Sequence, residues 1–135
     1  METIPIEKDL PLICVSATAF PTGVMDAHNK LQSIVPFVAG RKYFGLSRPE
    51  NGAIMYKAAA EVLNEKEAAL LNLEQIVLKR GNYVYADIPD FMQYLPLIAE
   101  TFAKLLAHPN IDPQGYCVEW YLNAKDVKCM VRLQD

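Results

Sequence analysis

One charged residue lies inside an otherwise apolar and aromatic strand pattern in the last fifth of the chain. Residues 116–122 read YCVEWYL and residues 127–133 read VKCMVRL, with a polar stretch between them. The alternation on both sides of that stretch predicts a β-hairpin. A carboxylate within such a strand is costly unless it is paired with a cation or used for function. That carboxylate, Glu119, is therefore the first residue to consider for a functional role.

The chain before the hairpin contains helix and strand patterns in a repeated order. The sequence Pro49-Glu50-Asn51-Gly52 predicts the turn of a hairpin, and Asn64-Glu65-Lys66-Glu67 predicts the N-cap of a short helix. Pro96 is compatible with a helix only if it lies in the first turn. The other expected elements are strands at 12–20, 43–48, 54–62 and 74–88, the last broken near Gly81, and helices at 24–35 and 95–107.

The order strand, helix, strand, strand thus occurs twice. We expect a single domain over residues 1–135, with one module at about 12–62 and a second at about 74–135. The predicted fold class is α+β, with an antiparallel sheet that carries both helices on one face. The other face of the sheet is then expected to form a ligand groove.

The composition indicates a globular protein without a basic surface. Apolar residues make up 52% of the chain and charged residues 21%, as in an ordinary folded domain. The formal net charge is −3 and the lysines and arginines are scattered, so the sequence predicts no nucleic-acid binding and no anionic-membrane binding. No apolar run is long enough to span a membrane, and the N-terminus lacks a signal-peptide pattern. We therefore expect a soluble, cytoplasmic protein.

The potential metal ligands do not form a site in the sequence. Cys14, Cys117 and Cys129 show no metal-ligand spacing, and neither histidine has a partner at such a spacing. We therefore expect no metal and no cofactor. His28 is expected to be solvated because it lies outside the apolar stripe of its helix, and His108 is expected to end the second helix. A monomer and a homodimer paired through an edge strand both remain open.

The register of the final hairpin decides which way Glu119 points. If residues 123–126 form the turn, Glu119 faces Met130 on the neighbouring strand. This register puts Trp120 under the helices. It puts on the groove face Cys117, Glu119 and Tyr121, beside Lys128, Met130 and Arg132.

Two interpretations of Glu119 then remain open. Lys128 and Arg132 are its diagonal neighbours and could form a cross-strand ion pair with it. Alternatively, Glu119 is partly desolvated in an aromatic-lined pocket and attracts a lipophilic cation through its charge and the ring faces. Desolvation would also raise the pKa of the carboxyl group, which suits a general acid or base.

Other side chains on the strands are expected to line the same groove. Tyrosine rings supply flat apolar surface with a polar end, and methionine supplies an adaptable wall. The expected ligand-binding residues beside Glu119 and Tyr121 are Tyr56, Tyr83, Tyr85, Met55 and Met130.

Four short segments carry a likeness to a known family. They are Arg80-Gly81-Asn82-Tyr83-Val84, Phe102-Ala103-Lys104-Leu105-Leu106, Asp112-Pro113-Gln114-Gly115 and Glu119-Trp120-Tyr121. Together with the doubled order of elements, they resemble the gyrase-inhibitor-like (GyrI-like) family, the effector-binding domain of bacterial multidrug-sensing transcription activators. The resemblance spans nearly the whole chain.

The resemblance implies a groove between two modules that takes hydrophobic, often cationic compounds. It places the family's pocket glutamate at Glu119 and its strand tyrosines at Tyr121 and Tyr83. The chain departs from the family pattern at Asp87-Ile88-Pro89-Asp90 and at Val131-Arg132-Leu133. The second departure places a cation close to the expected groove, and either departure could reshape the pocket.

The sequence therefore predicts a stand-alone small-molecule-binding protein that takes hydrophobic, cationic compounds, with Glu119 as its buried acidic anchor. Two alternatives stay open beside it. A branch of the family hydrolyses strained cyclopropane-containing compounds, which would make Glu119 and Tyr121 catalytic. Other members inhibit a partner protein such as gyrase. Whether the protein is an enzyme is thus undecided by its sequence.

Overall fold

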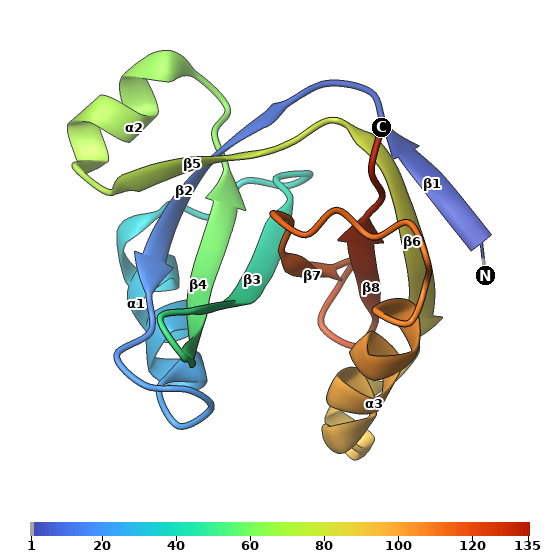
Figure 1. Ribbon diagram of the computed structural model, residues 1–135. Coiled ribbons are helices and arrows are strands. Elements are labelled where there is room, and N and C mark those ends of the chain that lie inside the picture. Colours follow the sequence, from blue (N-terminus) through green and yellow to red (C-terminus); the bar gives the residue numbers. More distant parts are fainter. Residues whose placement is uncertain (1) are drawn as a thin grey trace.

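The computed structural model describes residues 2–135 as one eight-stranded antiparallel sheet with three α-helices (Figure 1). The helices are α1 (Val24–Ile34), α2 (Glu65–Leu71) and α3 (Pro96–Leu105), with a short 3-10 helix η1 (Phe91–Gln93) before α3. The strands are β1 (Glu2–Ile6), β2 (Leu10–Ser16), β3 (Tyr43–Glu50), β4 (Ala53–Glu61), β5 (Glu74–Leu78), β6 (Gly81–Ile88), β7 (Cys117–Tyr121) and β8 (Val127–Arg132).

Local sequence signals place several of these elements as predicted. Asn51 and Gly52 have positive φ angles of 53° and 82°, which the tight turn between β3 and β4 requires. The Asn64 side chain accepts a hydrogen bond from the Glu67 backbone N–H at 3.0 Å and so caps α2. Pro96 lies in the first turn of α3, where its missing N–H is not needed.

Two features of the sheet differ from the prediction. The break predicted near Gly81 is present, and Gly81 has a φ of 142°, but the two parts of 74–88 are strands that lie at separate places in the sheet. β5 pairs with β2, whereas β6 pairs with β1 and β8. β1 itself was not expected, since Pro5 interrupts a short polar pattern. Proline is tolerated there because β1 is an edge strand.

The strand order is β1-β6-β8-β7-β3-β4-β2-β5. The arrangement of β2, β4 and β3 with α1 is repeated by β6, β8 and β7 with α3. The two halves meet in the middle of the sheet, where β3 pairs with β7. Tyr43 lies opposite Tyr121 at one end of this central pair and Ser47 lies opposite Cys117 at the other.

α1 and α3 lie on the same face of the sheet, each over its own half (Figure 1). Ala27 and Leu31 pack α1 onto β2 and β4, and Phe102 and Leu105 pack α3 onto β6 and β8. Each apolar helix face thus covers apolar strand residues. The predicted α+β class, with an antiparallel sheet and both helices on one face, is confirmed.

The opposite face of the sheet is filled by its own side chains. The sheet curls around a core made only of strand residues, in which Phe44, Leu46 and Val118 pack with Tyr83 and Met130. The groove was expected on this face and is not there. A curled sheet buries most side chains on its inner face against one another, so the larger open space lies on the helix face instead.

Candidate functional site

A groove of about 1300 Å³ lies on the helix face of the sheet, between α1 and the η1–α3 segment. Tyr56, Glu119 and Tyr121 line it from the strands. Within the described residues 2–135, Glu119 is the one carboxylate that lines this groove. The apolar residues of its walls include Phe20, Val24, Met25, Leu31, Phe91, Met92, Leu95 and Ile98.

The register of the final hairpin differs by one residue from the predicted one. Glu119 pairs with Cys129 rather than with Met130, because the connection between β7 and β8 runs from Leu122 to Asp126. A shift of one residue turns every side chain of a strand to the other face of the sheet. The β7 residues that consequently face the helices are Cys117, Glu119 and Tyr121.

Glu119 is held by tyrosine and not by a cation. Only 8% of the residue is exposed, and its Oε1 atom accepts a hydrogen bond from the Tyr121 hydroxyl at 2.5 Å. Lys128 pairs with Asp87 at 2.8 Å, and Arg132 points to the other face of the sheet. The cross-strand ion pair with Lys128 or Arg132 is therefore not formed.

Burial controls the protonation of the groove floor. Removal from water raises the pKa of Glu119, and the hydrogen bond from Tyr121, together with the nearby Tyr56 hydroxyl, only partly opposes this effect. Burial, followed by the nearby charge of Glu119, raises the pKa of both Tyr56 and Tyr121. Both tyrosines therefore stay protonated and act as hydrogen-bond donors at neutral pH.

His28 belongs to the same cluster, contrary to the prediction that it is solvated. Its Nε2 atom lies 2.7 Å from the Tyr56 hydroxyl, and its ring meets the rings of Tyr56 and Tyr121 edge-on. Burial lowers the pKa of the imidazole. A signal for this position is present in the sequence, because Val24, His28 and Leu31 follow the i, i+4, i+7 spacing of one helix face.

Gly45 makes room for the hydroxyl cluster. It lies on β3 directly opposite Glu119, and a Cβ atom there would overlap the Tyr56 hydroxyl. The Tyr121 hydroxyl would be 3.2 Å from the same Cβ. Only glycine lets the Tyr56 ring end reach across β3 toward Glu119.

The other two predicted tyrosines lie away from the groove. Tyr83 is buried in the strand-only core, where its hydroxyl donates to the Lys79 carbonyl at 2.5 Å. The Tyr85 hydroxyl donates to Glu2 at 2.8 Å, and the Lys128 ammonium lies 4.0 Å from the centre of its ring. Neither lines the groove.

The predicted methionines and Trp120 also point elsewhere. Met130 is fully buried in the strand-only core, and Met55 is partly exposed and does not line the groove. The Trp120 ring was expected under the helices. It packs instead against Phe44 on the opposite face, with ring centroids 6.0 Å apart, while Trp120 still contributes to the groove lining.

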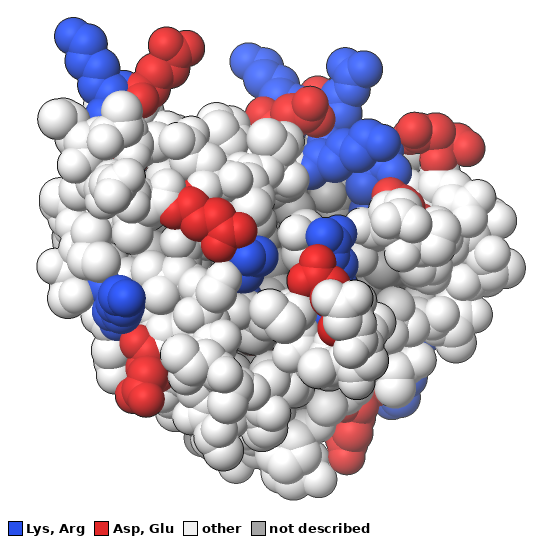
Figure 2. Space-filling view, turned by 60° about the vertical axis from the view of Figure 1, so that its left-hand side comes forward, with Lys and Arg blue, Asp and Glu red and all other residues white. Residues whose placement is uncertain are grey.

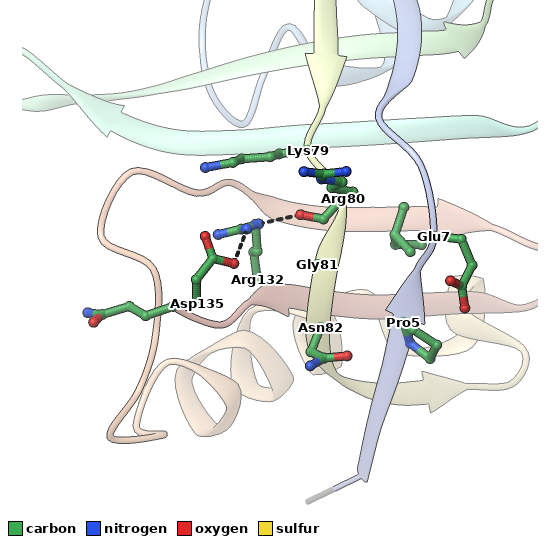
Figure 3. Close-up of a pocket in the computed structure, with 10 residues that line it drawn as sticks. Pro5, Glu7, Lys79, Arg80, Gly81, Asn82, Arg132 and Asp135 are labelled. Atoms are coloured by element: carbon green, nitrogen blue, oxygen red, sulfur yellow. Dashed lines mark hydrogen bonds and ion pairs between the residues drawn. The ribbon is translucent and has the colours of Figure 1, made fainter.

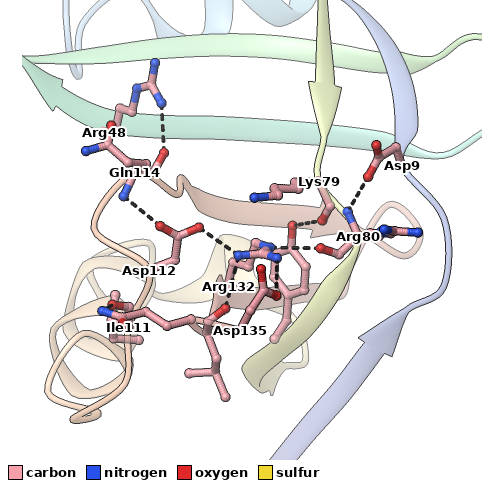
Figure 4. Close-up of polar contacts among 12 residues, drawn as sticks. Asp9, Arg48, Lys79, Arg80, Ile111, Asp112, Gln114, Arg132 and Asp135 are labelled. Carbon is pink, nitrogen blue, oxygen red and sulfur yellow. Dashed lines mark hydrogen bonds and ion pairs between the residues drawn. The ribbon is translucent and has the colours of Figure 1, made fainter.

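Arg132 occupies a second hollow of about 650 Å³, shown in Figure 3. Its Nε donates to the Arg80 carbonyl at 2.9 Å, its Nη1 to Asp112 at 2.9 Å and its Nη2 to Asp135 at 2.8 Å (Figure 4). These partners satisfy a side chain that is almost fully buried. The expectation that this cation lies close to the ligand groove is wrong, because Arg132 pairs with Tyr83 across β6 and β8 and shares its face.

The thiols and potential metal ligands do not form a second kind of site. All three cysteines are free, and burial raises the pKa of Cys117 to about 11 and that of Cys14 and Cys129 to about 12. Such thiols stay protonated at neutral pH. Within residues 2–135, no group of three or more His, Cys, Asp or Glu side chains is arranged to hold a metal ion.

The charged side chains on the face shown in Figure 2 stand apart in small groups of mixed sign over a largely uncharged surface. No large patch of one sign gathers on this face. Among residues 2–135, no helix is both long and apolar enough to cross a membrane.

Comparisons with solved structures find the same architecture. An integron cassette protein from Vibrio cholerae superposes with a TM-score of 0.69 at 15% identity, over 98% of this chain and 95% of that one. The protein SAV2435 bound to tetraphenylphosphonium gives 0.64 at 14% identity, over 98% and 93%. A Staphylococcus aureus protein named for bacterial transcription regulation gives 0.57 at 11% identity, over 99% and 97%.

No model of a known protein family matches the chain, and no curated protein matches it. At identities this low, the structural similarities establish the fold and not the function. The chain has the gyrase-inhibitor-like fold that its sequence motifs predict.

Proposed function

We propose that the protein binds small hydrophobic cations in the groove between α1 and α3, with Glu119 as the acidic anchor. One observation carries the proposal. A carboxylate that is 8% exposed lies at the floor of an apolar groove, and none of the ion pairs within residues 2–135 includes it. A structural carboxylate at this depth would ordinarily have a cation beside it.

A bound organic cation would supply the missing countercharge. Its apolar groups would replace water along the walls of the groove, and its charge would lie near Glu119 and the Tyr121 ring. The fold of SAV2435, which was solved with the lipophilic cation tetraphenylphosphonium, supports this choice of ligand class.

The two-module organisation gives the groove its two walls. We propose that residues 12–62 and 74–135 form the two modules, with α1 and α3 as equivalent helices on either side of the groove. The repeated arrangement of three strands and one helix supports this division. Under this proposal the anchor, Glu119, belongs to the second module but faces residues of both.

The proposal is tested with tetraphenylphosphonium as the probe. Isothermal titration calorimetry measures its affinity for each protein directly. Glu119→Gln keeps the size and hydrogen-bond acceptor of the side chain but removes its charge. We expect it to weaken binding by at least about tenfold, since hydrogen bonds and contacts to a buried charge are worth about 1.5–3 kcal/mol.

Glu7→Gln is the matched control, because it removes the same net charge from an exposed residue beside the second hollow (Figure 3). We expect it to bind like the wild type. A neutral aromatic compound of similar size should bind wild type and Glu119→Gln alike. Equal affinity of all three proteins for the cation would remove Glu119 as the anchor.

A hydrolase is the second candidate, and one contact favours it. A carboxyl group whose pKa is raised by burial lies 2.5 Å from the Tyr121 hydroxyl, an arrangement suited to proton transfer to a ligand. Turnover of a strained cyclopropane compound by the wild type, lost in Glu119→Gln with folding retained, would establish catalysis. Tight binding without turnover would leave the protein as a binder.

A further inference from the structure

Four side chains from three elements form one continuous hydrogen-bonded chain at the groove floor. His28 Nε2 of α1 lies 2.7 Å from the Tyr56 hydroxyl of β4, which lies 3.2 Å from the Tyr121 hydroxyl of β7. Tyr121 in turn donates to Glu119 at 2.5 Å. The chain therefore joins the imidazole of α1 to the carboxylate beneath the ligand position.

The direction of the bonds depends on whether His28 Nε2 carries a proton. Each tyrosine has one hydroxyl proton, and that of Tyr121 is used for Glu119. If Nε2 is unprotonated, the Tyr56 hydroxyl donates its proton to Nε2, and that proton is then not available on the carboxylate side of the chain. If Nε2 is protonated, His28 donates to Tyr56, and Tyr56 is free to donate to Tyr121. All the bonds of the chain then point toward Glu119.

We propose that His28 determines when the groove accepts a cation. In its imidazolium form it acts through Tyr56 and Tyr121 as an internal counter-ion for Glu119, and so it competes with the ligand. In its neutral form it leaves the carboxylate to the ligand. This inference rests on the proposed function, and it makes His28 a specificity-determining residue that needs no contact of its own with the charge of the ligand.

The other cations that line the groove are already engaged. Both Nη atoms of Arg41 pair with Glu67, at 2.8 and 2.7 Å, and the Lys42 ammonium lies 3.5 Å from Glu61. On the opposite wall, the residues contributed by η1 and α3 do not ionise. His28 is therefore the remaining basic group that can serve as the counter-ion of Glu119 among the described lining residues.

The remaining ionisable groups around the carboxylate stay neutral. Burial raises the pKa of the Cys117 thiol to about 11 and that of Cys129 to about 12. Tyr56 and Tyr121, whose pKa is also raised by burial, keep their protons. Protons taken up by the groove floor on acidification thus reside on Glu119 or His28.

Glu119 and His28 share the first proton that the groove floor takes up. Burial lowers the pKa of His28 and raises that of Glu119, which brings their titrations toward the same acidic range. Two groups coupled in this way take up the first proton as a pair. A proton on either member removes the free carboxylate from the ligand. Affinity for a cation should therefore begin to fall at a higher pH when His28 is present than when Glu119 titrates alone.

The first experiment measures tetraphenylphosphonium affinity from about pH 8 down to about pH 4, a range that contains the ordinary midpoints of both groups. The affinity of wild type and of His28→Gln at each pH is expressed relative to that protein's own affinity at the alkaline end. On acidification the wild type should lose affinity first, and His28→Gln should retain it to a lower pH. At pH values below the midpoint of this loss, the affinity of each protein falls about tenfold per pH unit for every proton that must leave before the cation binds. Superimposable pH profiles would overturn the proposal.

The second experiment needs no ligand. The chain has two histidines, and the imidazole resonances of His28 and His108 can be followed by NMR as a function of pH. Glu119→Gln should move the His28 titration to lower pH, because the variant lacks the charge that favours the imidazolium. His108 lies beyond α3, outside the groove, and accepts a hydrogen bond from the Asn110 N–H. An unchanged His28 titration would refute the coupling.

The two experiments separate the inference from the proposed function. If the wild type does not bind the cation even at the alkaline end, the proposed function fails and the role of His28 in cation binding fails with it. If the wild type binds but His28→Gln has the same pH profile, only the inference fails. The NMR titration then decides whether the hydrogen-bonded chain couples the two groups at all.

Discussion

Replacing Glu119 with glutamine should stabilise the fold at neutral pH, although it removes the proposed anchor. Folding transfers this carboxyl group from water to an 8% exposed position and raises its pKa above the ordinary value of 4.5. Between 4.5 and the raised pKa, the native protein keeps a proton that the unfolded chain has released. The free energy of unfolding therefore falls as the pH rises through this window, and the loss is complete above it.

The size of the effect follows from the shift. Each unit by which folding raises the pKa costs about 1.4 kcal/mol at pH values above the window. Glutamine does not titrate and escapes this cost, so its advantage grows with pH and then levels off. For a domain of this length, each kcal/mol corresponds to about 3–5 °C in the melting temperature.

Urea denaturation at a series of pH values measures the effect of Glu119→Gln directly. The comparison belongs in the His28→Gln background, because the imidazole titrates in an overlapping range. Glu7→Gln serves as the control, since it makes the same substitution at an exposed carboxylate. The desolvation argument would be contradicted if Glu119→Gln were less stable than its parent at about pH 8. It would also be contradicted if the difference in the free energy of unfolding between the two were the same at every pH.

Three further predictions concern the surroundings of the groove. Glu67→Ala should destabilise the fold by about 3 kcal/mol in urea denaturation, because it leaves the buried Arg41 guanidinium without its carboxylate, and a second change of Arg41 to methionine should recover much of the loss. Gly45→Ala should lower the free energy of unfolding by about 1–3 kcal/mol and weaken cation binding, since the new Cβ displaces the Tyr56 hydroxyl. Asn64→Ala should cost about 1 kcal/mol in thermal denaturation without changing affinity, as it removes only the cap of α2.

The order of helices and strands was predictable because local turn and capping residues lie at the ends of these elements. Asn51-Gly52, Asn64 and Pro96 each demand a particular backbone geometry, and each lies where that geometry occurs. These signals act over a few residues and do not depend on the rest of the fold. The edge strand β1 carries no such signal, since its formation depends on β6, which is far away in the sequence.

The contents of the groove were only partly predictable. Alternation divides the residues of a strand into two faces, but it does not say which face meets the helices. The connection runs from Leu122 to Asp126, whereas the assumed turn was 123–126. This difference of one residue shifts the register, and Glu119 therefore lies on the helix face. The role of His28 was missed because its partners, Tyr56 and Tyr121, come from strands distant in the sequence.

The central pairing of β3 with β7 places the groove floor at the seam between the two halves of the sheet. The two halves of the sheet are joined edge to edge along this pair, and each half carries one of the helices that bound the groove. Any twist of one half against the other displaces atoms in proportion to their distance from the seam. Glu119 and Gly45 face each other on the seam itself, so a twist that widened the groove for a bulkier proposed ligand would shift the walls far more than the Glu119 carboxylate.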